Sequence, residues 1–440
     1  MTILNNKVSR RDFLWISSLS AAGFITGCAV NPVTGKSQLM LVSEETEVQI
    51  DKQYAPHQFS ADYGVCQDRA LNNYISNLGK KMAAETHRPD MPYNFQALNS
   101  PRVNAYTFPA GSVGITRGIL VHLDNEAELA ALMGHELGHV NARHSAERMT
   151  KSKLTSVVMQ GVGMVLSAAN SNYAQLATQL GMVGGTLLLA KYSRDNEREA
   201  DSLAIEYMTK IQMNPQGCIG LMDMLQNLNK HNPGLMDIMF ASHPMSKERY
   251  ETAVNTSKSK YSFADSYPLN RERYMDNTAN LRKIQIPLQN MQYAEQAMAA
   301  GKFSEAETQL QNALRKVPGD YAALLLTSKC KLVQKQYSQA AKFANEAKQA
   351  HPQEAQAYNL AGLSKIYQKQ FSSALNDLDK YDKILPGNPD VIFLKGRSFE
   401  GMNRKENAAS HYTNYLKQVN SGDRAKYAYN RLIEWGYIKQ

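Results

Sequence analysis

Residues 134–140 read Gly-His-Glu-Leu-Gly-His-Val, and they contain the pattern HExxH between His135 and His139. On a helix, residues four apart lie on one face, so both imidazoles can reach one metal ion while Glu136 projects beside them. Two neutral histidines and one carboxylate leave zinc an open fourth position for water. Glu136 can then take a proton from that water as general base. The stretch therefore predicts a hydrolytic site with one zinc ion per chain.

A candidate for the third ligand lies further along the chain. Residues 194–201 read RDNEREAD and begin another predicted helix, on which Glu197 and Asp201 are four apart and share a face. One carboxylate can bind zinc while the other holds a ligand imidazole by its outer N–H. The alternative is an ordinary acidic first turn on a solvated helix. Because HExxH is also present, we favour metal binding as the interpretation of Glu197 and Asp201.

The flanking sequence predicts the elements that carry this site. We expect helices from Ser43, over 69–85, over 124–150 and over 196–213, where Asn214-Pro215 ends the last one. Short strands are predicted over 93–98, 103–108 and 113–116. Metallopeptidases hold an extended substrate against an edge strand, so we expect Asn104, Ala105 and Tyr106 to position substrate. The alternative for this strand is a place in the core.

Two further segments carry hypotheses of their own. Two apolar runs between residues 157 and 190 are each too short to span a bilayer, and we expect buried or amphipathic helices near the active site. His243 precedes Pro244 in a loop-like stretch after the break at 232–234. It is a surface residue, a donor to the oxyanion of the reaction, or a latch that fills zinc's open position. We favour the latch.

The second half of the chain repeats every 34 residues. Aromatic residues, alanines and prolines each keep this step: Phe303, Tyr337 and Phe371; Ala306, Ala340, Ala374 and Ala408; Pro318, Pro352 and Pro386. A small residue lets two helices of a hairpin approach closely, and a proline ends each second helix. The pattern resembles the tetratricopeptide repeat over 287–421, with a capping helix over 424–435. Such repeats bind peptides or partner proteins.

The N-terminus has the order of an export signal. A basic segment with Lys7, Arg10 and Arg11 precedes an apolar run and Ile25-Thr26-Gly27-Cys28. ITGC resembles a bacterial lipobox, in which Cys28 carries the lipid, and residues 9–14 resemble a twin-arginine signal. Ala29 favours the outer membrane in enterobacterial-type lipoproteins. The general secretory route remains the alternative for export.

Net charge and cysteine content limit the possible partners and disulfides only a little further. The formal net charge of +9 falls to about +7 without residues 1–28, and the basic residues are dispersed, so we expect no nucleic-acid partner. With Cys28 lipidated, Cys66, Cys218 and Cys330 allow at most one disulfide. The sequence does not choose the pair.

HExxH followed by ExxAD is similar to the gluzincin metallopeptidases of the HtpX and CAAX-prenyl-protease superfamily, in their soluble periplasmic branch. Further matches are NPVTGKSQLMLVSEETE from residue 31, VNAYTFPAGSVGITRGIL from residue 103, residues 125–144, and His243-Pro244 with Arg249. The resemblance covers residues 31–260, and with the repeats the architecture is similar to that of BepA-like proteases, which police assembly of outer-membrane β-barrel proteins.

The resemblance implies His135, His139 and Glu197 as zinc ligands and Glu136 as general base. It implies Asp201 as the group that orients a ligand, or as a proton donor. Possible partners that follow are unfolded or misassembled envelope proteins and the outer-membrane β-barrel assembly machinery.

We therefore expect an α+β, mostly helical zincin-type domain over 29–270, after a signal peptide over 1–28. An all-α repeat superhelix follows over 287–440. We expect a zinc-dependent endopeptidase of the periplasm that is lipid-anchored to the outer membrane. It would degrade misfolded or stalled proteins and assist the assembly of outer-membrane proteins. The alternative is a repeat-based chaperone whose protease site is latent.

Overall fold

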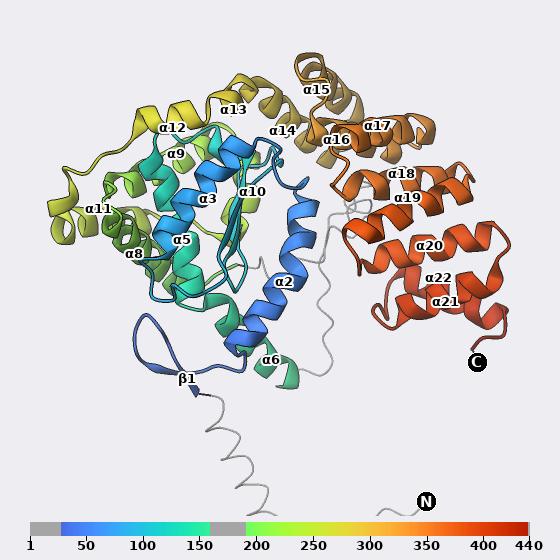
Figure 1. Ribbon diagram of the computed structural model, residues 1–440, viewed down its shortest axis with the longest axis horizontal. Helices are drawn as coiled ribbons and strands as arrows, with labels where there is room; N and C mark the ends of the chain where they lie inside the picture. The colour runs from blue at the N-terminus through green and yellow to red at the C-terminus, as the bar shows by residue number, and fades with distance from the viewer. Residues whose placement is uncertain (1–27, 159–190, 439–440) are drawn as a thin grey trace, which may run out of the picture.

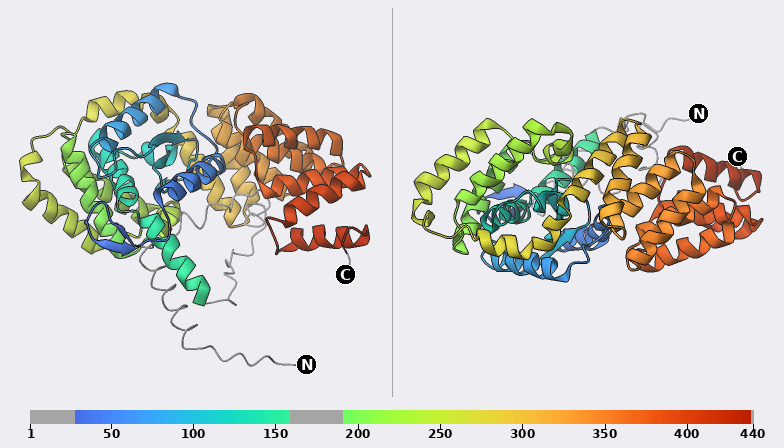
Figure 2. Two further views of the ribbon diagram at one scale, coloured as in Figure 1. Left: turned by 60° about the horizontal axis from the view of Figure 1, so that its bottom comes forward. Right: turned by 90° about the horizontal axis from the view of Figure 1, so that it is seen from above.

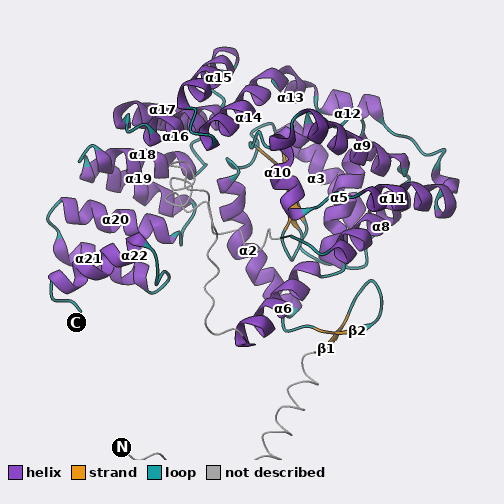
Figure 3. Cartoon of the chain, turned by 180° about the vertical axis from the view of Figure 1, so that it is seen from behind, coloured by secondary structure: helices purple, strands orange, loops and turns teal. Residues whose placement is uncertain are grey.

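The computed structural model describes residues 28–158 and 191–438. The chain is mostly helical (Figure 1). Its N-terminal half, residues 28–283, contains two small sheets and the HExxH segment, and is called the catalytic half after the expected activity. Its C-terminal half is made of helical hairpins. Strands form a small part of the molecule (Figure 3). This agrees with the expected α+β, mostly helical class. The apolar runs between 157 and 190 lie almost wholly outside the described residues, as does the signal segment 1–27.

The central sheet has three strands, which the sequence predicted. They are β3 (Asn94–Leu98), β4 (Ala105–Thr107) and β5 (Ser112–Thr116), in the order β3-β5-β4. β3 runs parallel to β5, and β4 pairs with β5 as an antiparallel hairpin in which Ala105 faces Ile115. β4 is therefore an edge strand. Its three residues are nevertheless buried, because neighbouring helices cover the sheet.

Helices α2 (Glu44–Ala61) and α3 (Arg69–Ala83) precede the sheet and begin where the sequence indicated. Ser43 caps α2 by accepting a hydrogen bond from the Thr46 amide, and Asp68 caps α3 in the same way. α2 lies on the side of the catalytic half that faces the repeats (Figures 1 and 3). A hairpin of β1 (Cys28–Val30) and β2 (Ser37–Leu39) comes before them.

The helix expected over 124–150 is two helices, and the expectation of one continuous element was wrong. α5 (Glu126–Asn141) ends and α6 (His144–Val158) begins around Arg143, which has a left-handed backbone with φ of 57°. The buried Arg143 guanidinium donates to the carbonyl of Val42 and pairs with buried Glu47. These contacts with the N-terminal segment hold a conformation that an arginine seldom adopts.

The HExxH helix packs closely against α8 (Arg194–Lys210) because glycine stands at two contact points. A Cβ atom at Gly138 would lie 2.9 Å from Cα of Ala200, and one at Gly134 would lie 3.0 Å from Cα of Ala204. The two glycines therefore allow the backbones to approach more closely than side chains would permit. α8 starts from Ser193, which forms a capping box with Asn196. This close approach brings the EREAD segment beside the HExxH segment.

Further helices complete the catalytic half and lead into the repeats. They are α4 (Arg117–Leu120), α9 (Gln216–His231), α10 (Pro233–Ser242), α11 (Lys247–Lys260), the 3-10 helix η1 (Ser262–Ala264), α12 (Arg271–Asn277) and α13 (Ala279–Lys283). The expected break at Asn214-Pro215 is present, and α10 follows the break at Asn232.

The 34-residue period corresponds to stacked helical hairpins. The helices are α14 (Gln285–Ala299), α15 (Phe303–Lys316), α16 (Tyr321–Val333), α17 (Tyr337–Ala350), α18 (Gln356–Tyr367), α19 (Phe371–Ile384), α20 (Pro389–Gly401), α21 (Lys405–Leu416) and the cap α22 (Asp423–Glu434). The periodic alanines 306, 340, 374 and 408 are fully buried where paired helices meet. The hairpins extend away from the catalytic half to the C-terminus (Figure 2).

Two expectations about membranes and disulfides can be compared with the described residues. Within residues 28–158 and 191–438, none of the helices combines the length and the apolar character needed to cross a bilayer. Cys66, Cys218 and Cys330 are free thiols in this structure, so the disulfide that the sequence left open is not formed among them.

Candidate metal centre

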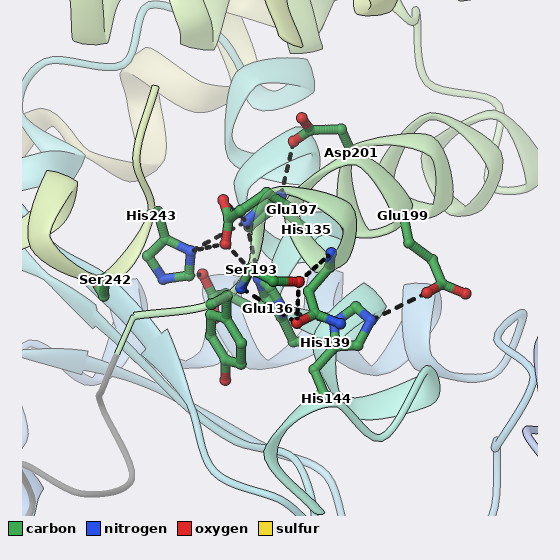
Figure 4. A network of polar contacts seen from close by, with 12 residues as sticks. His135, Glu136, His139, His144, Ser193, Glu197, Glu199, Asp201, Ser242 and His243 are labelled. Carbon is green, nitrogen blue, oxygen red and sulfur yellow. Dashed lines mark hydrogen bonds and ion pairs between the residues drawn. The ribbon is translucent and has the colours of Figure 1, made fainter. Parts of the chain in front are cut away.

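Three segments bring four buried donor residues together. α5 supplies His135 and His139, α8 supplies Glu197, and His243 follows directly after α10. One donor atom from each lies within 4.8 Å of all the others (Figure 4). The four side chains are at least nine-tenths buried. Residues separated by up to 108 positions in the chain thus converge on one point.

The spacing of these atoms fits a tetrahedral metal ion. Nε2 of His139 lies 3.1 Å from Nε2 of His135 and 3.4 Å from a Glu197 oxygen. Nδ1 of His243 lies 3.3 Å from Nε2 of His135 and 3.1 Å from the same Glu197 oxygen. Two ligands of a tetrahedral zinc ion with bonds of about 2.0–2.1 Å are ~3.3 Å apart. Three ring nitrogens and a carboxylate that face one another in a buried pocket are donors that such a cation accepts.

Glu136 lies beside this cluster and lacks a hydrogen bond among the described residues. It is fully buried, and neither carboxylate oxygen has a hydrogen-bond partner there. Nε2 of His243 is 3.8 Å from one of these oxygens. Burial raises the pKa of Glu136, while the nearby charges of His243 and His135 oppose the rise. A buried carboxylate with free lone pairs can accept a proton from a molecule that enters the centre.

Asp201 and Arg249 form a second layer on the far side of His135. A carboxylate oxygen of Asp201 lies 3.0 Å from Nδ1 of His135, the nitrogen that points away from the cluster. Arg249 on α11 donates to both oxygens of Asp201 at 2.7 Å and lies 2.7 Å from Glu197. Burial opposes ionisation of Asp201, but the hydrogen bonds and charges of Arg249 and His135 together outweigh it and lower the pKa of this carboxyl. The Asp201 carboxylate is therefore held charged and fixes the ring of His135.

A chain of polar contacts through His144 and Glu199 holds His139, and the sequence did not predict it. Nδ1 of His139 lies 2.9 Å from Nδ1 of His144, and Nε2 of His144 lies 3.2 Å from Glu199 (Figure 4). When Nε2 of His139 binds a metal, Nδ1 carries the proton and donates it to His144, which in turn donates to Glu199. The Tyr192 ring stacks on His139 with 3.8 Å between ring centroids. The sequence signal was the pair His139 and His144, but only the break at Arg143 lets them meet.

The remaining predicted site residues lie outside the donor cluster. Asn104, Ala105 and Tyr106 are buried at the edge strand, where Tyr106 donates a hydrogen bond to Asp62 at 2.7 Å. The Oδ1 atom of Asn104 is buried without a hydrogen-bond partner among the described residues. Cys28 begins β1 in the N-terminal hairpin.

Comparison with known proteins agrees with this geometry. Residues 69–257 match the model of peptidase family M48, and residues 297–363 match a tetratricopeptide-repeat model. The beta-barrel assembly-enhancing protease of Escherichia coli (strain K12) is 25% identical over 82% of this chain and 78% of its own length. Metalloprotease YcaL of the same strain is 34% identical over 36% of this chain and 59% of its own. Mitochondrial metalloendopeptidase OMA1 of Schizosaccharomyces pombe is 28% identical over 54% and 70%.

Among solved structures, yeast Tom70 aligns with 72% of this chain and 82% of its own at 11% identity. Its TM-score of 0.33 is too low to support an inference. The family matches, the relatives and the HExxH geometry all agree. The chain is a metalloendopeptidase that joins a peptidase family M48 domain to tetratricopeptide repeats, and it is homologous to the beta-barrel assembly-enhancing proteases.

Proposed function

We propose that this protein is a zinc-dependent endopeptidase of the bacterial cell envelope, which degrades misfolded or stalled proteins and assists outer-membrane protein assembly. The observation that carries the proposal is the buried set of four donors at tetrahedral spacing beside the unpartnered Glu136. The names of the homologous beta-barrel assembly-enhancing proteases support the envelope context and the link to assembly. The repeats are suited to hold protein substrates or partners, including the β-barrel assembly machinery.

Each residue has a proposed role in hydrolysis. His135, His139 and Glu197 would hold one zinc ion per chain, which would supply a Lewis acid and lower the pKa of water. Glu136 takes the proton of the attacking water and passes it toward the leaving amine. Asp201 orients His135 through Nδ1, and its bidentate pairing with Arg249 favours this role over that of a proton donor.

Substitutions separate metal binding from proton transfer. His135→Ala, His139→Ala and Glu197→Ala should each lose zinc, because each removes one protein ligand. Glu136→Gln should keep zinc and the fold, yet lose casein hydrolysis by about two orders of magnitude or more, since only the base is removed. Metal analysis and casein digestion of the purified variants test this. A full equivalent of zinc in Glu197→Ala would show that the third ligand is misassigned.

A latent protease is the second candidate, and His243 is the observation that favours it. Nδ1 of His243 lies where a fourth ligand would stand, at 3.1–3.3 Å from Glu197 and His135. An imidazole there would take the place of the water that a bound zinc ion needs for hydrolysis. The protein would then act mainly as a repeat-based chaperone until His243 moves away. Zinc content together with casein hydrolysis by the wild-type chain distinguishes an active enzyme from a silent one.

The proposed location follows from the first residues of the sequence. We propose residues 1–28 as a lipoprotein signal, 29–270 as the catalytic domain and 287–440 as the repeat domain. Lipid on Cys28 would anchor the chain to the outer membrane on the periplasmic side. Cys28→Ser should yield an unprocessed or unanchored form on fractionation. A mature wild-type protein whose intact mass lacks acyl chains would contradict the anchor.

A further inference from the structure

The repeat domain contacts the base of the β4–β5 hairpin at three points. On α14, Nε2 of Gln292 donates to the carbonyl of Pro101 at 2.7 Å, and Glu295 pairs with Arg102 through two contacts of 3.0 Å. Pro101 and Arg102 lie in the segment that enters β4. Where the hairpin ends, Arg117 of α4 pairs with Asp320, the N-cap of α16, at 2.8 Å. Both ends of the hairpin therefore rest on repeat helices.

Two of these contacts contain buried charges, which are costly unless they are paired. Arg117 and Asp320 are each more than nine-tenths buried, and Arg117 also donates twice to the carbonyl of Asn99. Glu295 is 7% exposed. Removing one partner of such a pair leaves an uncompensated charge. The pairs therefore favour one position of the repeat helices against the catalytic half. The surfaces cannot slide past one another without breaking them.

The repeat domain also reaches the middle of β4, through hydrogen bonds of Tyr63 and Tyr106. Tyr106 of β4 donates to Asp62, and the next residue, Tyr63, donates to Oε1 of Glu295 at 2.8 Å. Tyr63 has a left-handed backbone with φ of 66°. This turn lets Asp62 face Tyr106 of β4 while Tyr63 faces Glu295 of α14. A tyrosine in this region is strained, and such strain persists only where the surroundings hold it. Nζ of Lys329 on α16 lies 4.3 Å from the centre of the Tyr63 ring.

We propose that α14, through Glu295, is a positioning element for the substrate strand β4, so that the repeat domain sets the geometry in which the protease holds its substrate. This inference rests on the proposed use of β4 as the substrate strand. Glu295 acts through Tyr63 and Arg102 and does not touch the reacting atoms. The repeats thus have two roles: they bind proteins, and they support the strand that presents them for cleavage.

Amide hydrogen exchange of the full zinc-loaded chain tests this link without relying on catalysis. Tyr63→Phe removes only the hydroxyl group that meets Glu295, and Glu295→Gln removes the charge that pairs with Arg102. Each should speed exchange in peptides over residues 103–108 by roughly fivefold, the effect of about one net hydrogen bond. Zinc content should not change. In casein kinetics, KM should rise by a similar factor while kcat changes less than about twofold, because the strand holds substrate equally in the ground state and the transition state.

Two controls match these variants. Gln67→Ala removes a 3.0 Å hydrogen bond to the carbonyl of Ala350, a contact with the repeats that does not reach the hairpin base. Tyr381→Phe removes a buried hydroxyl within the repeats that accepts from Asn388. Neither should change exchange in β4.

Unchanged exchange over 103–108 in both test variants would overturn the proposal. So would equal acceleration across α3, α9 and β4, which is the signature of general destabilisation. If the wild-type chain fails to cut casein, the proposed function fails, while the exchange result still decides the link.

Discussion

Arg249 contacts three parts of the candidate metal centre at once. Its guanidinium donates to Asp201, lies against Glu197, and donates to the carbonyl of Pro244 at 2.8 Å, in the segment that follows His243. It is 6% exposed. The guanidinium therefore holds Glu197, the Asp201 carboxylate that contacts His135, and the base of the His243 loop. The position of His243 is a property of this network and not of its own loop alone.

His243→Ala separates the roles proposed for this residue. If the imidazole is a latch, its removal opens the fourth position and casein hydrolysis should rise by roughly tenfold, which corresponds to about 1.4 kcal/mol. Zinc content should stay the same because three ligands remain. His231→Ala is the control, since His231 is an exposed histidine on α9. The measurement is the rate of casein degradation per zinc-loaded molecule.

Two other outcomes would contradict the latch. A fall in rate of about 10²–10³ would indicate that His243 stabilises the oxyanion. An unchanged rate would indicate that its burial beside Glu136 has no part in the reaction.

The residues of the centre could be predicted to the extent that local spacing defines them. HExxH and ExxAD each place two groups on one helical face, so His135, His139, Glu197 and Asp201 could be found from sequence. The sequence also predicted that one of the two carboxylates would hold an imidazole by its outer N–H. It did not say which imidazole, because the contact between Asp201 and Nδ1 of His135 depends on the packing of α5 on α8. His144 and Glu199 were missed because the helix was expected to continue through Arg143, which would have pointed His144 elsewhere.

At the scale of elements, the repeats contain a second periodic feature that the sequence barely indicates. The turns inside the hairpins each have one residue with a left-handed backbone: Gly301, Lys335, Lys369 and Asn403, with φ between 59° and 74°. They keep the 34-residue step of the alanines. Only Gly301 is a residue type that favours this conformation without cost. The repeat geometry therefore fixes the backbone here, whereas the residue type does not.

Lys369→Gly should therefore stabilise the repeat domain. A left-handed residue other than glycine costs about 1–2 kcal/mol, part of which is offset by the greater freedom of glycine in the unfolded chain. We expect a gain of about 0.5–1 kcal/mol in the free energy of unfolding, measured by urea denaturation. Lys380→Gly is the matched control, because Lys380 is an exposed residue inside α19. It should lose about 1 kcal/mol. A change of the same sign in both variants would refute the conformational argument.

At the scale of the whole molecule, the two halves are joined by contacts that no local pattern announces. Arg117 and Asp320 are 203 residues apart, and each alone looks like an ordinary surface charge in the sequence. Hydrophobic packing is also continuous, since one core cluster extends from Tyr63 in the catalytic half to Leu432 in α22. The sequence could predict two domains from the change of period. It could not predict that they share a core, because long-range pairing has no periodic signal.

Lys329 shows what this shared interior does to a charged group. It is 2% exposed on α16, close to Tyr63, Asp62 and Arg102 of the catalytic half and to Glu295 of α14. Burial lowers the pKa of Lys329 to about 7, and the charge of Glu295 opposes that shift. The unfolded chain keeps the ordinary value near 10.5. Between these two values the unfolded state binds more protons than the folded state, so stability must rise with pH across this window.

Lys329→Met tests this coupling, since methionine fills similar space without a charge. The stability that deprotonated Lys329 provides is full above pH 10.5 and is lost as pH falls through 7. Between pH 7 and 9 the free energy of unfolding of the wild-type chain should therefore rise relative to that of the variant, by about 1 kcal/mol per pH unit. Urea denaturation of both proteins at pH 6, 7, 8 and 9 measures this difference in the free energy of unfolding. The contributions of other titrating groups cancel because both proteins contain them. A difference that stays constant over this range would mean that Lys329 keeps its proton in the folded chain, because the carboxylates of Glu295 and Asp62 would then outweigh its burial.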